Sequence, residues 1–196
     1  MSTRPMIDLP EPSDSSVSLE TALRLRRSVR EFDAEPLSRA EIGQLLWAAQ
    51  GVTADWGGRT APSAGALYPL ELHAVTPTGA LHYLPDGHRV EITSERDLRL
   101  DLRAAALDQD AVERAPFVAV VVVVPERTAA TYGERAGRYV DLEAGHAAQG
   151  LLLQTAAMDL VAVPIGAFDD DAVATVLALP RGHEPRYLVP VGRSPS

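Results

Sequence analysis

Four arginines crowd around one serine near the start of the chain, since Arg24, Arg26, Arg27 and Arg30 flank Ser28. Guanidinium groups bind phosphate oxygens through paired, charge-assisted hydrogen bonds. The cluster therefore predicts an anion site. The alternative is structural, because arginines at the C-terminal end of a helix are favoured by the helix dipole and need no ligand.

A second candidate segment consists of small residues, Pro62-Ser63-Ala64-Gly65-Ala66-Leu67-Tyr68-Pro69. Without large side chains, the backbone can closely approach a flat ligand. A plain surface loop would have the same composition, so the segment alone does not decide between the two interpretations.

Two further segments lie after predicted strands. Ile165, Gly166 and Ala167 precede Asp169, and Gly166 can expose backbone N–H groups where the strand ends. Arg193 follows the last predicted strand and adds a second source of positive charge. Taken alone, these segments are equally typical of a strand–helix turn and of a chain end.

Composition excludes several classes of function. The 196 residues are 46% hydrophobic, which indicates one globular domain with a substantial core. A net charge of -9 disfavours nucleic acid and anionic membranes as partners. With no cysteine and no metal-ligand spacing among the histidines, a metal site is not expected. The sequence shows neither a signal peptide nor an apolar run that approaches the ~20 residues of a membrane span, which favours a cytoplasmic protein.

Helices and strands are expected to alternate irregularly within one domain, residues 18–196, preceded by a flexible arm, residues 1–17. Ser18 is expected to cap a helix to about Arg27, and Ser38 with Glu41 forms a capping box for a helix that ends at Gly51. Further helices are expected at 95–107, at 137–160 and after Asp169. The helix at 137–160 is apolar nearly all round, which is typical of a buried or interface helix.

The strands are expected at 70–76, 81–83, 89–92, 117–124, 161–165 and 187–191. The segment 117–124 contains six valines in eight residues without alternation, which predicts a central strand covered on both faces. The segments 81–83 and 89–92 read as a hairpin. Together these elements predict an α+β, three-layer sandwich.

In this order, the motifs resemble the nitroreductase superfamily. The stretch Arg26-Arg27-Ser28-Val29-Arg30-Glu31-Phe32 is similar to its opening signature. The later segments 45–53, 61–69, 143–146, 165–170 and 190–193 are similar to the branch named for streptolysin S dehydrogenase and the thiazoline oxidases. The resemblance covers nearly the whole chain from about residue 18.

The resemblance implies a central, mostly antiparallel sheet flanked by helices, and an intertwined homodimer that holds FMN between its subunits. By position, Arg26, Arg27, Ser28 and Arg193 match residues that hold the phosphate and ribityl chain. Arg30 matches a cation near the N1/O2 edge of the flavin. The partner subunit's contribution matches Pro62, Ser63, Ala64, Gly65 and Leu67, and the backbone beside the ring and its N5 matches Ile165, Gly166 and Ala167.

The implied activity is hydride transfer between flavin N5 and a small-molecule or peptide-derived substrate, with natural-product biosynthesis as the expected setting. Peptide-azoline oxidases of this branch carry a Lys-Tyr pair where this chain has Thr131-Tyr132, and Tyr132 is the candidate acid or base. Two alternatives stay open: an NAD(P)H-dependent reductase of quinones or nitroaromatics, and a catalytically idle flavoprotein subunit of a biosynthetic complex.

Overall fold

The computed structural model describes residues 4–195, so the first three residues of the predicted arm and Ser196 lie outside it. Within these residues the strands form one sheet in the order β1-β4-β3-β2-β5-β7-β6, and every neighbouring pair is antiparallel. The strands are β1 (Met6–Asp8), β2 (Leu70–Thr76), β3 (Gly79–Leu84), β4 (Arg89–Ser94), β5 (Phe117–Val123), β6 (Val161–Ala162) and β7 (Glu184–Gly192).

Strand β5 lies in the interior of the sheet, between β2 and β7, and all of its residues are buried. Alternate side chains enter opposite layers: Phe117 and Val121 join one hydrophobic cluster, while Val118 and Val120 join the other. A strand with two buried faces can be apolar at every position, so the valine run takes the central place predicted for it.

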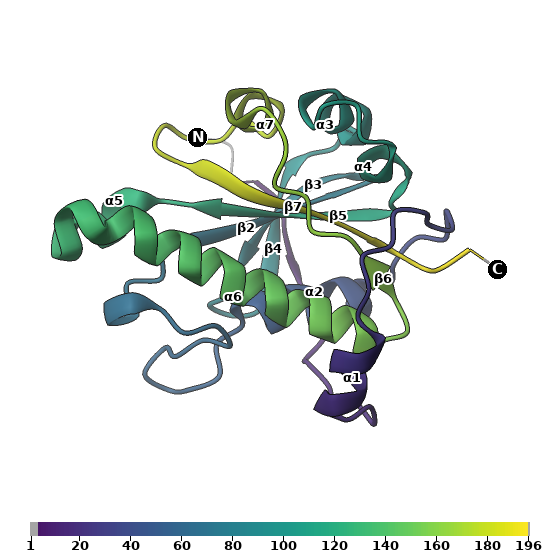
Figure 1. Cartoon of the computed structure of the whole chain (residues 1–196), viewed down its shortest axis with the longest axis horizontal. Coiled ribbons are helices and arrows are strands. Elements are labelled where there is room, and N and C mark those ends of the chain that lie inside the picture. The colour runs from purple at the N-terminus through teal and green to yellow at the C-terminus, as the bar shows by residue number, and fades with distance from the viewer. Residues whose placement is uncertain (1–3, 196) are drawn as a thin grey trace.

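Helices cover both faces of the sheet, and the molecule has three layers (Figure 1). Below the sheet in this view lie α1 (Leu19–Leu25), α2 (Arg39–Gln50) and α6 (Ala136–Ala157), and above it lie α3 (Arg99–Ala105), α4 (Asp110–Arg114) and α7 (Asp170–Val176). Helix α5 (Pro125–Tyr132) and the 3₁₀ turn η2 (Gly133–Arg135) lead into α6, and η1 (Ala64–Ala66) lies in the small-residue loop. The predicted α+β sandwich with an antiparallel sheet is confirmed.

The three predicted N-caps, Ser18, Ser38 and Asp169, are confirmed in atomic detail. The Ser18 hydroxyl accepts from Thr21 N at 3.2 Å, which caps α1. At α2, Ser38 N donates to Glu41 Oε2 at 2.7 Å while Glu41 N donates to Ser38 Oγ at 3.2 Å, which completes the capping box. Asp169 caps α7 in the same manner.

Several elements differ from the sequence-based expectations, among them helices α4 and α5, which were not predicted. Within the segment predicted to be a flexible arm, Met6–Asp8 pairs with β4 and extends the sheet. The helix expected at 95–107 begins only at Arg99, because the Asp97 carboxylate turns the chain by accepting from Arg99 N at 3.0 Å. The strand expected at 161–165 is interrupted at Pro164, which has no N–H to donate, and resumes only as a bridge between Ile165 and Leu188.

No helix among residues 4–195 is both long and apolar enough to cross a bilayer.

Candidate functional site

The arginine cluster lies where α1 ends beside the edge strand β6. Ser28 forms a parallel bridge with Ala162, and Val29 N donates to Ala162 O at 3.0 Å. Arg27 Nη1 donates to the carbonyl oxygens of Arg24 and Arg26, both at 2.8 Å. Arg27 thus satisfies carbonyls at the end of α1, which is the structural role that the sequence left open.

Arg26 and Arg30 differ from Arg27, because neither makes an ion pair or a side-chain hydrogen bond within residues 4–195. Arg30 is exposed, and half-buried Arg26 lines a cavity of about 150 Å³ against Leu152 and Thr155 of α6. Two guanidinium groups without carboxylate partners among the described residues, each two positions from Ser28 in the chain, are suited to an anion.

Arg193 lies at the same end of the sheet. Gly192 of β7 pairs with Val161 of β6, and Ser28 bridges to Ala162, the next residue of β6. Ser28 and the residue before Arg193 therefore flank the same strand. The Arg193 guanidinium is already engaged, however, because Nε lies 2.9 Å from Glu35 Oε2 and Nη2 lies 2.9 Å from Glu41 Oε1. A phosphate at Arg193 would have to compete with these two carboxylates.

The segment Ile165–Ala167 is fixed at one side and open at the other. Ile165 exchanges two backbone hydrogen bonds with Leu188, at 2.8 and 3.0 Å. Gln109 Nε2 donates to Ala167 O at 2.8 Å. Gly166 and Ala167 are exposed, and within the described residues their N–H groups donate to no acceptor. These N–H groups are therefore available to a ligand.

A hollow of about 440 Å³ borders Gly166 and is closed by Ala144 of α6 together with Phe168 and Tyr187. Arg186 lines it and is held by Asp141 at 2.8 Å and Glu184 at 2.6 Å. Arg186 does not stand out in the sequence, because its carboxylate partner on α6 is 45 residues away in the chain.

The small-residue loop is built on left-handed backbone, with φ of +62° at Gly65, +52° at Ala66 and +45° at Tyr68. A Cβ on Gly65 would lie 2.9 Å from the Tyr132 hydroxyl, so a larger residue there would displace the Tyr132 side chain and strain the backbone at this φ. Tyr132 in turn packs edge-on against Tyr139 of α6, with ring centroids 4.9 Å apart. The loop and Tyr132 therefore form one structural unit.

A buried carboxyl group supports this loop from α6. Glu143 is only 3% exposed, and its Oε1 has no hydrogen-bond partner among the described residues. Burial raises the pKa of Glu143 to about 7, while the Ser63 hydroxyl and the Arg59 guanidinium oppose the shift. Arg59 donates to Gln50 Oε1 at 2.9 Å. The sequence signal for this residue was a carboxylate on an otherwise apolar helix.

Helix α6 separates the two halves of the candidate site. Glu143 faces the loop, whereas Thr155 lies at the arginine cluster, and the 12 residues between them span about 18 Å of helix. Asp141, which faces the hollow beside Gly166, lies about 200° around the helix from Glu143. One chain therefore places the arginines and Gly166 on one side of α6 and the loop with Tyr132 on another.

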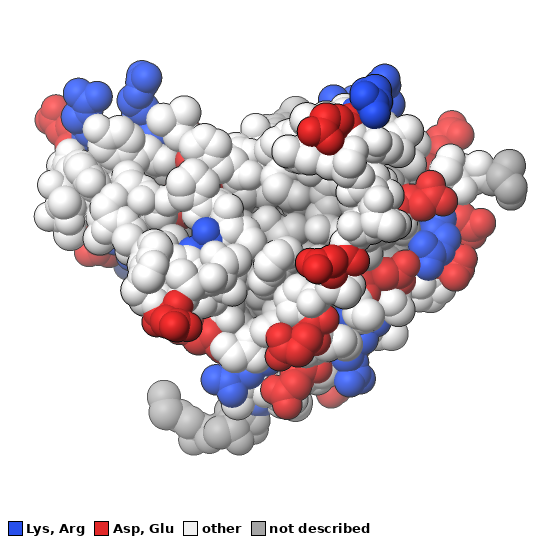
Figure 2. Space-filling model, turned by 90° about the horizontal axis from the view of Figure 1, so that it is seen from below, with Lys and Arg blue, Asp and Glu red and all other residues white. Residues whose placement is uncertain are grey.

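The face below the sheet is hollowed between two lobes (Figure 2). This concave face carries few charged side chains, whereas acidic and basic groups gather around its rim. Large apolar side chains are exposed on the helices of this side, namely Leu19 and Leu23 of α1 and Leu142 of α6, at 61%, 52% and 50%.

Comparisons with known proteins agree on one family. The sequence profile described as "Nitroreductase family" matches residues 23–193. A protein named as a nitroreductase from Methanocaldococcus jannaschii is 37% identical over 188 residues, which cover 93% of this chain and 94% of that protein. A crystal structure named as a nitroreductase from Ralstonia eutropha is 32% identical with a TM-score of 0.89, and covers 100% of this chain and 96% of its own.

Two more distant structures share the fold. The NADPH:FMN oxidoreductase from Vibrio harveyi, complexed with NAD⁺, has a TM-score of 0.69 at 20% identity and covers 91% of this chain and 69% of its own. A chain of the Escherichia coli microcin synthetase complex, with a truncated pro-microcin bound, has a TM-score of 0.74 at 24% identity and covers 96% and 78%.

The buried carboxyl group of Glu143 predicts a pH dependence of stability. Its folded pKa of about 7 lies above the ordinary glutamate value of 4.5, so the fold favours the protonated form. This stabilisation is complete below pH ~4.5 and is lost as the pH rises through about 7. Relative to Glu143→Gln, the wild-type free energy of unfolding should fall by about 1–3 kcal/mol across this interval.

Urea unfolding of both proteins at pH 4.5, 6 and 8 measures this difference, with Glu134→Gln as the exposed control. Parallel stability curves for wild type and Glu143→Gln would contradict the assignment.

Proposed function

Because the chain belongs to the nitroreductase family, and is thus an FMN-dependent oxidoreductase, we propose that it oxidises a small-molecule or peptide-derived substrate in natural-product biosynthesis. The flavin supplies the chemistry, since its N5 accepts and returns hydride. The observation that carries the proposal is that, within residues 4–195, the guanidinium groups of Arg26 and Arg30 and the N–H groups of Gly166 and Ala167 all lack partners.

These residues fit the two ends of an FMN. Arg26 and Ser28 would hold the phosphate, together with Arg27 and Arg193 once their present partners yield. Arg30 would lie near the N1/O2 edge of the ring, where a cation favours the anionic reduced flavin and raises its reduction potential. The N–H groups at Gly166 and Ala167, beside Ile165, would donate to the ring edge that includes N5.

A homodimer would complete this site. The opposite placement of the loop and the arginine cluster around α6 supports a site to which each chain contributes a different half. The partner's Pro62, Ser63, Ala64, Gly65 and Leu67 would then cover the flavin. Tyr132 touches Gly65, so it would accompany the loop to the partner's flavin and act there as acid or base.

The substrate class distinguishes the candidate functions. The fold likeness to a chain of the microcin synthetase complex supports an oxidation in natural-product biosynthesis, whereas the likeness to the NADPH:FMN oxidoreductase supports an NAD(P)H-dependent reductase. Thr131 stands where azoline oxidases of the branch have lysine, and it cannot transfer a proton as lysine does. This substitution favours a substrate other than a peptide azoline, and it also motivates the idle-subunit alternative.

The first prediction concerns the cofactor. The purified protein should carry about one FMN per chain, visible in its absorbance spectrum and identified after heat release. Arg26→Ala should weaken FMN binding by about 10- to 100-fold, because it removes a charge-assisted bond to the phosphate. Arg181→Ala, an exposed arginine outside the cluster, is the control. Unchanged occupancy in Arg26→Ala would refute the phosphate assignment.

The second prediction concerns assembly. Leu142→Arg places a charge on the exposed side of α6 and should shift the dimer toward monomer in light scattering, with loss of flavin. Leu100→Arg makes the same change on α3, in the opposite layer, and should leave the dimer intact. A monomeric wild type that retains flavin would exclude a shared site.

The third prediction concerns turnover. Under the proposal, NADH and NADPH give no steady-state turnover with menadione, although the flavin is reduced by dithionite and reoxidised by oxygen. Sustained NAD(P)H oxidation would favour the reductase instead. In that case a Tyr132→Phe variant with full flavin content tests whether the tyrosine acts as acid or base, and its kcat is expected to be about 100-fold lower. A flavin that no donor reduces would leave the idle subunit as the better description.

A further inference from the structure

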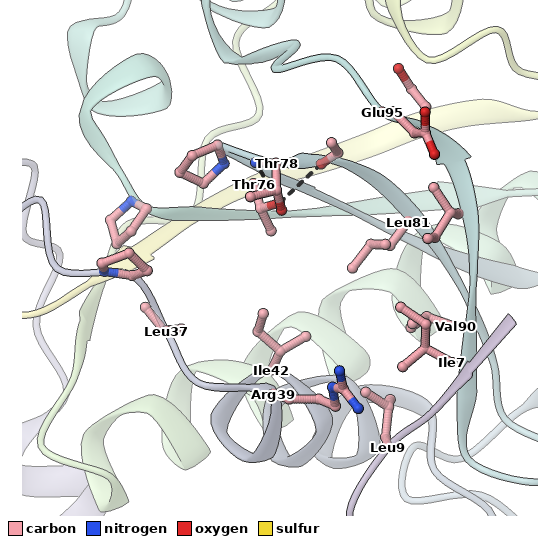
Figure 3. A pocket seen from close by; sticks show the side chains of 16 residues that line it. Ile7, Leu9, Leu37, Arg39, Ile42, Thr76, Thr78, Leu81, Val90 and Glu95 are labelled. Carbon is pink, nitrogen blue, oxygen red and sulfur yellow. Dashed lines mark hydrogen bonds between the residues drawn. The ribbon is translucent and has the colours of Figure 1, made fainter. Parts of the chain in front are cut away.

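A pocket of about 550 Å³ lies on the lower face of the sheet, and none of the candidate cofactor residues lines it (Figure 3). The pocket exists because the sheet extends beyond the helices that cover its lower face. Helices α2 and α6 pack on β2 and β5, whereas in the described part of the chain neither packs extensively on β3 or β4. Leu81 of β3 and Val90 of β4 therefore face a space that no helix fills.

The walls are mostly apolar and come from four elements. Leu81 and Val90 form the sheet side, Ile42 of α2 lies opposite, and Ile7 and Leu9 of the N-terminal segment close one end. Pockets of this size with apolar walls and few polar groups are typical of small-molecule sites.

The closing segment is held in place by hydrogen bonds. Leu9 N donates to His88 O at 3.0 Å, and the His88 ring contacts Pro10 O through Nε2 at 3.0 Å. His88 Nδ1 in turn lies 2.9 Å from the hydroxyl of buried Tyr83. The end wall is thus formed before any ligand arrives, which lowers the entropic cost of binding.

One cation lines the pocket. Arg39 lies beside Leu9 and Ile42 (Figure 3), and it makes no ion pair or side-chain hydrogen bond within residues 4–195. It is the first residue of α2, where the helix dipole disfavours a positive charge. Arg39 is exposed at the rim of the pocket, so its guanidinium is free to meet an anionic group there.

We propose that this pocket binds an apolar carboxylic acid of medium chain length, with its tail between Leu81, Val90 and Ile42 and its carboxylate on Arg39. A single guanidinium matches one negative charge. Glu95 on the opposite wall disfavours a dianionic head such as a phosphate monoester. The site is separate from the proposed flavin site, and its existence does not depend on the proposed function.

Isothermal titration of the purified full chain with sodium decanoate tests the proposal, with decan-1-ol as the uncharged comparison. Saturable binding of one decanoate per chain is expected. Arg39→Met should weaken it at least about tenfold, which corresponds to about 1.4 kcal/mol. Arg181→Met should change nothing, and decan-1-ol should bind wild type and Arg39→Met equally.

A second variant tests the location independently of charge. Ile92→Trp adds volume to a half-buried position of the pocket wall and should abolish decanoate binding, with an unchanged melting temperature showing that the fold is intact. Hydrogen exchange should slow at residues 76–81 and 90–95 when wild type binds decanoate. Absence of saturable binding, equal binding by Arg39→Met, or undiminished binding by a folded Ile92→Trp would each overturn the proposal. Loss of dimer in Arg39→Met without any decanoate binding would show a subunit contact instead.

Discussion

Strand β5 bonds along both edges, to β2 and to β7, while its side chains fill the cores above and below the sheet. The remaining structure is arranged around this strand. The pairing of β5 with β7 sets the position of β6, and Ala162 of β6 in turn forms a backbone bridge with Ser28. The arginine cluster and the Gly166 segment are therefore positioned through backbone pairing that begins at the most apolar strand, and not by contacts between their own side chains.

The arginines differ in how far carboxylates within the chain compensate their charge. Arg186 and Arg193 each contact two carboxylates, so their charge is largely compensated within the chain. Arg26, Arg30 and Arg39 have no such partner among residues 4–195, and they differ from other arginines without one because Arg26 and Arg39 line cavities and Arg30 lies two residues from Ser28. In a protein with net charge -9, uncompensated guanidinium groups stand out as places where an anion gains most.

The sequence predicts the features of this fold that depend on neighbouring residues. Ser38 and Glu41 are three residues apart, so their capping box can be recognised from the sequence. The valine-rich sequence of β5 likewise predicts a strand with two buried faces. Features that depend on distant residues were missed or incomplete. The pairing of Met6–Asp8 with β4 and the engagement of Arg193 by Glu35 join segments far apart in the chain. For the candidate site, the motif order identified the segments, but only the structure shows that Arg27 caps α1.

The position of β7 has a consequence for how the molecule folds. Its partner β5 comes much earlier in the chain, and α5, α6, β6 and α7 lie between them. Until β7 docks, β5 presents an apolar edge with unpaired N–H and C=O groups, which is a template for pairing with another chain. Long-range closure of this kind slows folding. Partly folded molecules would therefore be most prone to aggregate through the strand that later becomes the most protected.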